Sequence, residues 1–398
     1  MHQRELLRWR NAIFTLFLVN GAVSATWAAR LPAIREDTGS SLQAMGFALL
    51  GAAVGALAGL SIGPVLMHRI GAKRALGWGF AGMLAGMLLA ALSSSVLGSI
   101  WAVAGSAAWW GISMGSADVV TNIEAAANER EIGRTLMPLM HGFFSIGTVV
   151  GALGGAAAAA AHWSVLLNIA VVVGLSSGAV WWALRGIPNR ADIGAEDAAH
   201  AGEPRGRAVD AWRLPIVLLI GVGVLANGFA EGGANDWMAI GAVDGHGLSP
   251  ALGAALLGTF VSGMTIVRFF GGPLVDRWGR VMVLRVSAIV ALSGVSGFIW
   301  GHALWVIAAG ALLWGAGVAL SFPLGMSAAA DGPNGPARVS VVSTLGYGAF
   351  LIGPPVLGFL GQVFGILPAL TVFIALLAVS AFVAPAAREQ RGVHAHTT

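Results

Sequence analysis

The chain contains no cysteine, and only 10% of its 398 residues are charged. Without cysteine, neither a disulfide nor a thiolate metal site can form. Soluble domains carry about 25% charged residues, so this surface is not built to face water. The sequence offers no nucleophile with its base, no spaced set of metal ligands and no nucleotide-binding loop. We therefore expect neither an enzyme nor a cofactor.

Apolar sequence is what the chain has in abundance: 57% of its residues are hydrophobic, and the mean hydropathy is +0.80. Apolar runs of about 20 residues, enough to span a bilayer as a helix, recur from end to end. Open strands leave backbone groups unpaired in lipid, so the spans must be helices. We predict an all-α membrane protein with twelve transmembrane helices at residues 11–33, 42–66, 75–94, 97–126, 137–161, 163–184, 213–238, 251–274, 281–300, 303–328, 339–361 and 364–385.

Two polar landmarks recur at nearly the same spacing. Asn20-Gly21 is matched by Asn227-Gly228, since 227 − 20 = 207, and His68–Gly71 is echoed by Asp276–Gly279, since 276 − 68 = 208. Duplicated halves are typical of many transporters. The predicted parts are a six-helix half at 1–185, a cytoplasmic linker at 186–212, a second six-helix half at 213–386 and a cytoplasmic tail at 387–398.

The positive charge of the chain follows its predicted topology. The formal net charge is +4, and most Arg residues and the single Lys fall at the termini, in the linker and in the connections of one side. The opposite side holds only Arg30 and Arg35. This bias places both termini in the cytoplasm, with the chain in the inner membrane. The basic balance therefore predicts a lipid partner and no nucleic acid, and the first span reads as a retained anchor.

The segment Gly272–Arg280, with the sequence GPLVDRWGR, lies between the second and third predicted helices of the second half. It resembles the loop that marks both halves of the major facilitator superfamily. The first half keeps part of this pattern but has His68 where Asp is usual. The resemblance implies twelve helices in two pseudo-repeated halves, and Asp276 is also placed to cap the next helix. It gives a gating or structural role to Arg69, Asp276, Arg277 and Arg280.

Further stretches are similar to the fucose permease branch of that superfamily. Gly115–Asn122 matches a Gly-x-x-acid-x-x-x-Asn stretch of fucose permease, although Ala28 and Phe144 stand where that protein carries a carboxylate and an amide. Fucose itself is therefore not the expected solute. The central Arg of the drug/proton antiporters is missing too. Segments resembling bacterial relatives of the branch are Trp27–Pro32, His141–Ser145, Glu231–Trp237 and Gly353–Pro355.

Two carboxylates inside predicted spans are the candidate proton carriers, Asp118 and Glu231. An ionisable group at the bilayer centre costs about 2.5–3.5 kcal/mol on insertion scales, so each one needs a function or a partner. Asp118 and Asn122 lie four residues apart, hence on one helical face. The alternatives are a structural hydrogen bond for Asp118 and a buried pair with an Arg for Glu231.

Amides and one aromatic ring form the predicted solute site. Asn227, Glu231 and Asn235 follow one another at four-residue spacing, so they share a face that we expect to border an aqueous cleft. Amides bind hydroxylated solutes, and the ring of Trp27 can stack on a sugar. Hydrogen bonding between helices is the alternative for these amides. The predicted solute-binding residues are Asn20, Trp27, Asn122, Asn227 and Asn235.

The remaining polar residues of the spans are assigned to gating or structure. We expect Arg268 to be the partner of an acid, and Glu124 and Arg130 to belong to a cytoplasmic gate. His141 is either a structural residue or a proton relay. The His residues show no metal spacing, so no metal site is predicted.

These features favour a proton-coupled secondary transporter that moves a small, polar, sugar-like solute by alternating access, as a monomer. An exporter of metabolites or drugs by proton antiport is the alternative within that class. A membrane sensor that binds without transport is the alternative from another class. The solute, its direction, the coupling ion and the stoichiometry stay open.

Overall fold

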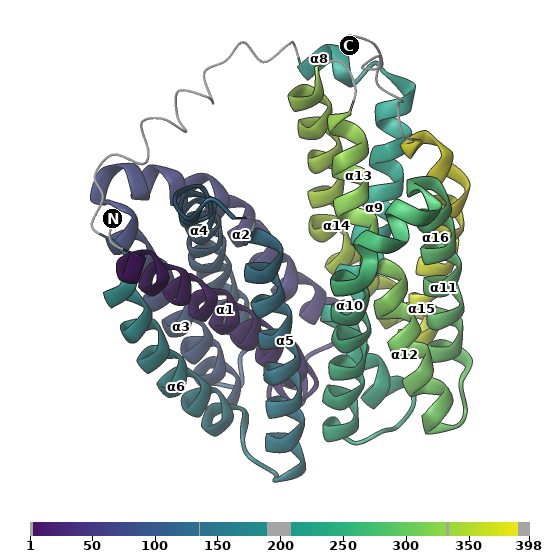
Figure 1. The fold of residues 1–398 in the computed structure, drawn as a ribbon. Coiled ribbons are helices and arrows are strands. Elements are labelled where there is room, and N and C mark those ends of the chain that lie inside the picture. The colour runs from purple at the N-terminus through teal and green to yellow at the C-terminus, as the bar shows by residue number, and fades with distance from the viewer. Residues whose placement is uncertain (1–2, 135, 189–207, 332–333, 389–398) are drawn as a thin grey trace. The chain divides into compact units, whose positions relative to one another are not determined.

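The computed structural model describes residues 3–134, 136–188, 208–331 and 334–388, and every regular element in these ranges is a helix (Figure 1). The predicted all-α membrane class is confirmed. The helices are α1 (Gln3–Thr38), α2 (Leu42–Ile70), α3 (Ala72–Ser95), α4 (Ile100–Ile132), α5 (Met137–Ala160), α6 (Val165–Gly186), α8 (Ala208–Ala211), α9 (Pro215–Ile240), η1 (Gly241–Gly245), α10 (Pro250–Trp278), α11 (Arg280–Trp300), α12 (Leu304–Val318), α13 (Ser321–Ala330), α14 (Gly335–Phe364), α15 (Ile366–Leu370), α16 (Val372–Val383) and η2 (Ala384–Ala387).

Eleven of the described helical segments are long and apolar enough to cross a membrane. The one predicted span missing from these eleven is 97–126, which corresponds to α4; it carries Asp118, Asn122, Glu124 and Asn128 and is therefore less apolar. It packs against α1, α2 and α3. A polar helix enclosed by apolar helices can keep its polar groups away from lipid.

The duplication is visible in the bounds of the helices. α2 and α10 begin 250 − 42 = 208 residues apart, and α3 and α11 begin 280 − 72 = 208 residues apart. Gly71 and Gly279 make the intervening turns with φ of 82° and 75°, a backbone region that favours glycine. One expectation was wrong: Asp276 does not cap α11. It lies inside α10, and Gly279 is the N-cap, without a side-chain hydrogen bond.

The predicted span 303–328 is interrupted in the structure. α12 ends at Val318 and α13 begins at Ser321, so Ala319 and Leu320 form a break. Pro323 explains the break, because it has no N–H to bond the carbonyl of Ala319 four residues earlier.

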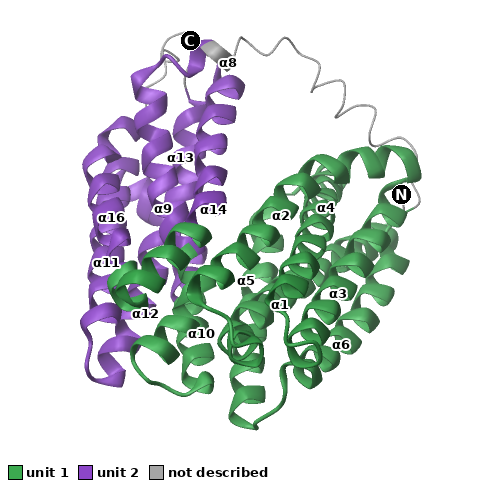
Figure 2. Cartoon of the chain, turned by 180° about the vertical axis from the view of Figure 1, so that it is seen from behind, with its two compact units in different colours: residues 1–201, 233–262, 354–369 green, residues 202–232, 263–353, 370–398 purple. Residues whose placement is uncertain are grey.

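The described chain forms two compact units (Figure 2). Unit 1 contains residues 1–201, 233–262 and 354–369, and unit 2 contains residues 202–232, 263–353 and 370–398. Four helices change unit within their length, and three of these crossings fall at a glycine: α9 at Gly232-Gly233, α10 at Ser262-Gly263 and α14 at Gly353-Pro354. The fourth crossing is in α15, at Ala369-Leu370. The division into halves at 1–185 and 213–386 stays a prediction, and most of the predicted linker and tail lies outside the described residues.

Small residues bring the helices of unit 1 into close contact. A Cβ added to Gly55 or Gly59 of α2 would lie 2.2 Å from a backbone oxygen of α4. A Cβ on Gly111 of α4 would lie 2.1 Å from the oxygen of Ala52 in α2. Such spacing lets two backbones touch in lipid, where small residues mark helix interfaces.

Candidate functional site

Asp118 of α4 and Asn20 of α1 meet inside unit 1. The Nδ2 of Asn20 donates to the Oδ1 of Asp118 at 3.3 Å. Asn20 is 2% exposed, whereas Asp118 is half-buried. The next residue, Gly21, packs against the backbone of Phe144 in α5 with no room for a Cβ. The structure thus joins a predicted proton carrier to a predicted solute-binding amide from another helix.

Two other predicted solute-binding residues of unit 1 are engaged in different contacts. The amide of Asn122 is turned back along α4, and its Nδ2 donates to the backbone oxygen of Asp118 at 2.9 Å. Trp27 is 5% exposed, and its ring stacks on Trp110 with centroids 5.9 Å apart. One face of the Trp27 ring is therefore already covered by protein.

A buried polar contact lies near the N-terminal end of α1. The indole Nε1 of Trp9 donates to the Oε2 of Glu124 at 2.9 Å, and both residues are at most 1% exposed. The amide of Asn128 donates to the backbone oxygen of Leu6 at 3.3 Å. Glu124 was a predicted gate residue, but Trp9 was not named. The sequence did offer a signal for Trp9, because it is an aromatic residue within a basic N-terminal stretch.

Glu129 caps α5 across the α4–α5 turn. Its Oε2 accepts hydrogen bonds from the backbone N–H of Met137 at 2.6 Å and of Leu136 at 2.5 Å. These two bonds hold the pKa of Glu129 below its usual 4.5, because they favour the charged form. Glu129 lies beyond the predicted span 97–126. The neighbouring gate candidates are both exposed, Arg130 and His141, and the His141 ring lies 5.0 Å from that of Phe17.

Unit 1 also joins segments that are far apart in the sequence. The Nη1 of Arg35, at the end of α1, lies 2.5 Å from the Oδ2 of Asp244 in η1. The N–H of Leu42 donates to the Oε1 of Gln362 in α14 at 3.1 Å. Gly46 of α2 packs on Pro354, leaving no room for a side chain. Segments 233–262 and 354–369 are thus bonded to the first 201 residues.

In unit 2, Glu231 of α9 is paired with Arg268 of α10. The Nη2 of Arg268 lies 2.8 Å from the Oε1 of Glu231. The Nε of the same guanidinium donates to the carbonyl oxygen of Ala319 at 3.4 Å. This is the carbonyl that Pro323 leaves without a helical partner. Arg268 therefore connects a predicted proton carrier to the break between α12 and α13.

The three-residue stripe on α9 does not line one surface. Asn227 is 2% exposed and turned into unit 2, where its Nδ2 donates to the Oγ of Ser380 at 2.5 Å and to the oxygen of Gly223 at 2.9 Å. Asn235 is half-buried on the portion of α9 that belongs to unit 1. The single face expected from the spacing is therefore divided between two units.

Three residues at the turn between α10 and α11 were predicted to have a gating or structural role, and one of them, Arg280, is buried and bonded to α13 and the residue after it. Arg280 is 8% exposed, and its guanidinium reaches Asp331 at 2.8 Å and Ser327 at 3.1 Å. Asp276 and Arg277 are exposed, as is Arg69 in the matching turn of the first half. Within the described ranges, no three His, Asp or Glu side chains gather as metal ligands would.

One family model matches the chain over most of its length. The model of the Major Facilitator Superfamily matches residues 12–331 and 220–394. The chain belongs to the Major Facilitator Superfamily. The relatives of this superfamily member are membrane transporters, so the chain is a multi-pass membrane transporter and not an enzyme.

Relatives and solved structures of superfamily members agree over nearly the full length. An uncharacterised transporter of Sinorhizobium fredii, y4wD, is 30% identical over 365 residues, covering 90% of this chain and 93% of that protein. A mutant of the nucleoside transporter NupG has a TM-score of 0.78 at 11% identity, covering 96% and 98% of the two chains. A D-xylose–proton symporter has a TM-score of 0.63 at 14% identity, covering 92% and 97%. At such identities the structures share the fold alone.

Proposed function

We propose that the chain is a proton-coupled secondary transporter of a small polar solute, working by alternating access in the bacterial inner membrane. The contact between Asn20 and Asp118 carries this proposal. It places an ionisable carboxylate of one helix against an amide of another inside a chain that belongs to a transporter family. A proton that crosses 100 mV supplies about 2.3 kcal/mol, enough to drive solute accumulation.

Asp118 is the proposed primary proton carrier. Protonation would remove its negative charge and change its hydrogen bond with Asn20, so that proton loading alters the amide that faces the solute. Asn20 and Asn122 are the proposed solute-binding amides of unit 1, and Asn235 is a further candidate. We leave Trp27 and Asn227 out of the direct site, because Trp110 and Ser380 already occupy them.

Glu231 is the proposed second proton carrier, with Arg268 as its counter-charge. A protonated Glu231 would no longer neutralise Arg268, which would be free to bind the carbonyl of Ala319 alone or an acceptor on a solute. This arrangement links protonation to the broken helix α12–α13. A sugar-like solute is supported by the amides among the proposed solute-binding residues, and a xylose–proton symporter and a nucleoside transporter share this fold.

Alternating access requires some of the contacts in unit 1 to open. If both termini are cytoplasmic, two contacts of unit 1 lie at the outer ends of their helices: Arg35 with Asp244, and Leu42 with Gln362. The ion pair and the hydrogen bond among them tie the second half of the sequence to the first. Opening toward the outside would have to break them. The chain is proposed to do this as a monomer.

Purified protein in liposomes tests the proposal. An imposed pH gradient should drive the accumulation of polar solutes from a radiolabelled panel. Asp118→Asn should reduce this accumulation to the level of empty liposomes, because Asn cannot carry a proton. The matched control Asp210→Asn, at an exposed residue of α8, should retain it.

The same assay separates the alternatives. Proton-driven efflux with no uptake would support the exporter, and saturable binding with no flux in either direction would support the sensor. Full proton-driven uptake by Asp118→Asn would remove Asp118 as the carrier.

A further inference from the structure

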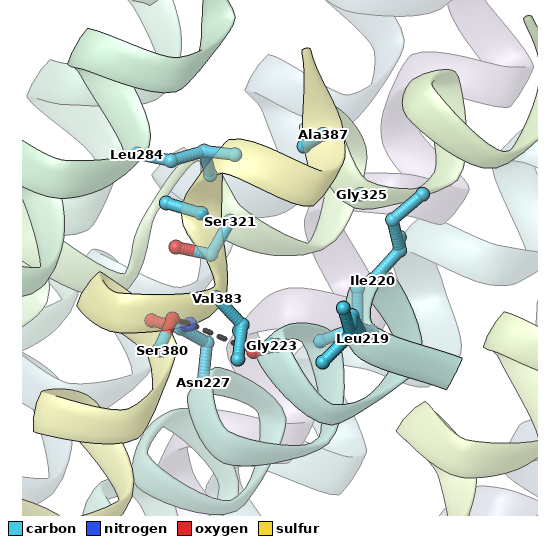
Figure 3. A pocket seen from close by; sticks show the side chains of 12 residues that line it. Leu219, Ile220, Gly223, Asn227, Leu284, Ser321, Gly325, Ser380, Val383 and Ala387 are labelled. Atoms are coloured by element: carbon cyan, nitrogen blue, oxygen red, sulfur yellow. Dashed lines mark hydrogen bonds between the residues drawn. The ribbon is translucent and has the colours of Figure 1, made fainter. Parts of the chain in front are cut away.

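A small cavity lies inside unit 2, between α9, α13 and α16 (Figure 3). It measures about 20 Å³, and every side chain that lines it is uncharged. Three of the lining residues are polar, one from each of these helices: Asn227, Ser321 and Ser380. They are 2%, 3% and 7% exposed, so all three are deeply buried.

The orientation of the Asn227 amide follows from its neighbours. A carbonyl oxygen only accepts hydrogen bonds, so the amide nitrogen must be the atom that faces the oxygen of Gly223 at 2.9 Å. The same nitrogen donates to the Oγ of Ser380 at 2.5 Å. The atom left over is therefore Oδ1, which can only accept.

Two buried oxygens at this cavity have no partner among the residues that the structure describes, the Oδ1 of Asn227 and the Oγ of Ser321. Buried polar atoms in folded proteins are nearly always hydrogen-bonded. Asn227 needs a donor, and the hydroxyl of Ser321 can both donate and accept. The hydroxyl of Ser380 accepts from Asn227 and keeps its own hydrogen to donate.

We propose that this cavity is a binding site for one water molecule that bridges Asn227 and Ser321, with Ser380 as a third partner. A water needs a cavity of about 10–15 Å³ by the same measure and two to four polar partners, and both conditions are met. An alkali cation does not fit the lining, because no carboxylate is present and burying an unpaired charge is very costly.

The position of the site gives the water a structural role. Ser321 is the first residue of α13, directly after the break at Ala319 and Leu320. Arg268 of α10 bonds the freed carbonyl of Ala319. The water would tie the start of α13 to α9 and α16. One water would therefore join three helices at the place where the α12–α13 segment loses its continuous backbone hydrogen bonding.

Ser321→Ala tests the proposal by the sign of its effect on thermal stability. In a dry cavity, the substitution removes an unpaired buried hydroxyl and should leave the melting temperature unchanged or raise it. In a hydrated cavity, it removes a hydrogen bond to the water and should lower the melting temperature by about 2–4 °C. The control is Ser177→Ala, where an exposed hydroxyl bonds only its own helix, and no change is expected.

X-ray radiolysis gives a second readout, because hydroxyl radicals formed from bound water label the side chains beside it. Ile220 and Val224 line the cavity and are 4% and 2% exposed, so little of their surface is open to bulk water. Both should be labelled above Val342, which is fully buried in the same hydrophobic cluster but does not line the cavity. Ser321→Ala should reduce that labelling.

Three results would overturn the water site. The first is a higher or unchanged melting temperature in Ser321→Ala. The second is labelling of Ile220 and Val224 no greater than that of Val342. The third is stabilisation of the wild type by NaCl over KCl that Ser321→Ala abolishes, which would assign the cavity to a cation. None of these results depends on transport, so the proposed function can fail while the water site stands.

Discussion

Single side chains in this transporter bond partners on other helices, and their chemistry limits what each can do. Asp118 accepts from an amide, whereas Glu231 faces a guanidinium. When a carboxylate beside an amide is charged, that neighbour stabilises it by a hydrogen bond but supplies no opposite charge. A carboxylate beside an Arg is paired with a full opposite charge. Asp118 and Glu231 therefore have partners of different charge, so removing the partner of Glu231 tests its role.

The variant Arg268→Gln removes the charged partner of Glu231 and tests the role of that ion pair. Without the guanidinium, Glu231 loses the cation that lies 2.8 Å from it, and the carbonyl of Ala319 loses its hydrogen bond. Proton-driven uptake should then fall, and the remaining uptake should still depend on Asp118. The measurement is proton-driven uptake in wild type, Arg268→Gln and Arg268→Gln with Asp118→Asn. Uptake equal to that of the wild type would contradict this role for Arg268.

Glu129 gives a pH dependence of stability whose sign follows from its pKa. The hydrogen bonds from Met137 and Leu136 lower this pKa below 4.5, so their stabilisation is present above pH 4.5 and is lost as the pH falls through the lowered value. Glu129→Gln should lower the melting temperature at neutral pH. The difference from wild type should vanish in strong acid. A difference that is equal at both pH values would show that charge is not the cause.

At the scale of the helix, glycine positions decide which backbones can touch. Gly111 of α4 contacts the backbone of α2, whereas Gly105 of the same helix has nothing within 4 Å of an added Cβ. Gly111→Ala forces the two helices apart, and overpacking of this kind costs about 1–3 kcal/mol. Gly105→Ala should be neutral or slightly stabilising, because Ala favours helix.

The measurement is the melting temperature of both variants in one detergent. Equal values for Gly111→Ala and Gly105→Ala would mean that α2 and α4 can separate at no cost. Such a result would contradict the close helix contact described for unit 1.

The positions of the helices could largely be predicted from the sequence, but the contacts between helices could not. Apolar runs set the twelve spans, and glycines at the matching turns set the repeat. The contacts of Trp9 with Glu124 and of Asn227 with Ser380 join residues 115 and 153 positions apart. Helical periodicity describes one helix at a time and says nothing about which helix it meets. The break at Ala319 was missed because hydropathy does not register the lost N–H of Pro323.

At the scale of the whole molecule, removing the Arg35–Asp244 ion pair tests whether outward opening of the transporter breaks it. Asp244→Asn removes the pair, which as a partly exposed ion pair contributes up to about 1 kcal/mol. If outward opening breaks it, the open state should become about two- to fivefold more populated. The absence of native cysteine makes this measurable with a single introduced thiol.

The thiol is Leu42→Cys, at a residue that is 8% exposed beneath the 354–369 segment. A membrane-impermeant maleimide should label it faster when Asp244→Asn is added. The control is Leu97→Cys, which is 67% exposed and should react at the same rate in both backgrounds. Equal rates at Leu42→Cys would mean that the pair does not restrain opening.

The three unit crossings at glycine bear on where such motion can occur. α9, α10 and α14 each pass from one unit to the other at a residue without a side chain, at Gly232-Gly233, Gly263 and Gly353. Glycine weakens the local helix by about 1 kcal/mol relative to alanine, and so lowers the energy of a kink at that point. A kink at these three glycines would bend only helices that follow the linker, because α1 to α6 each stay within a single unit.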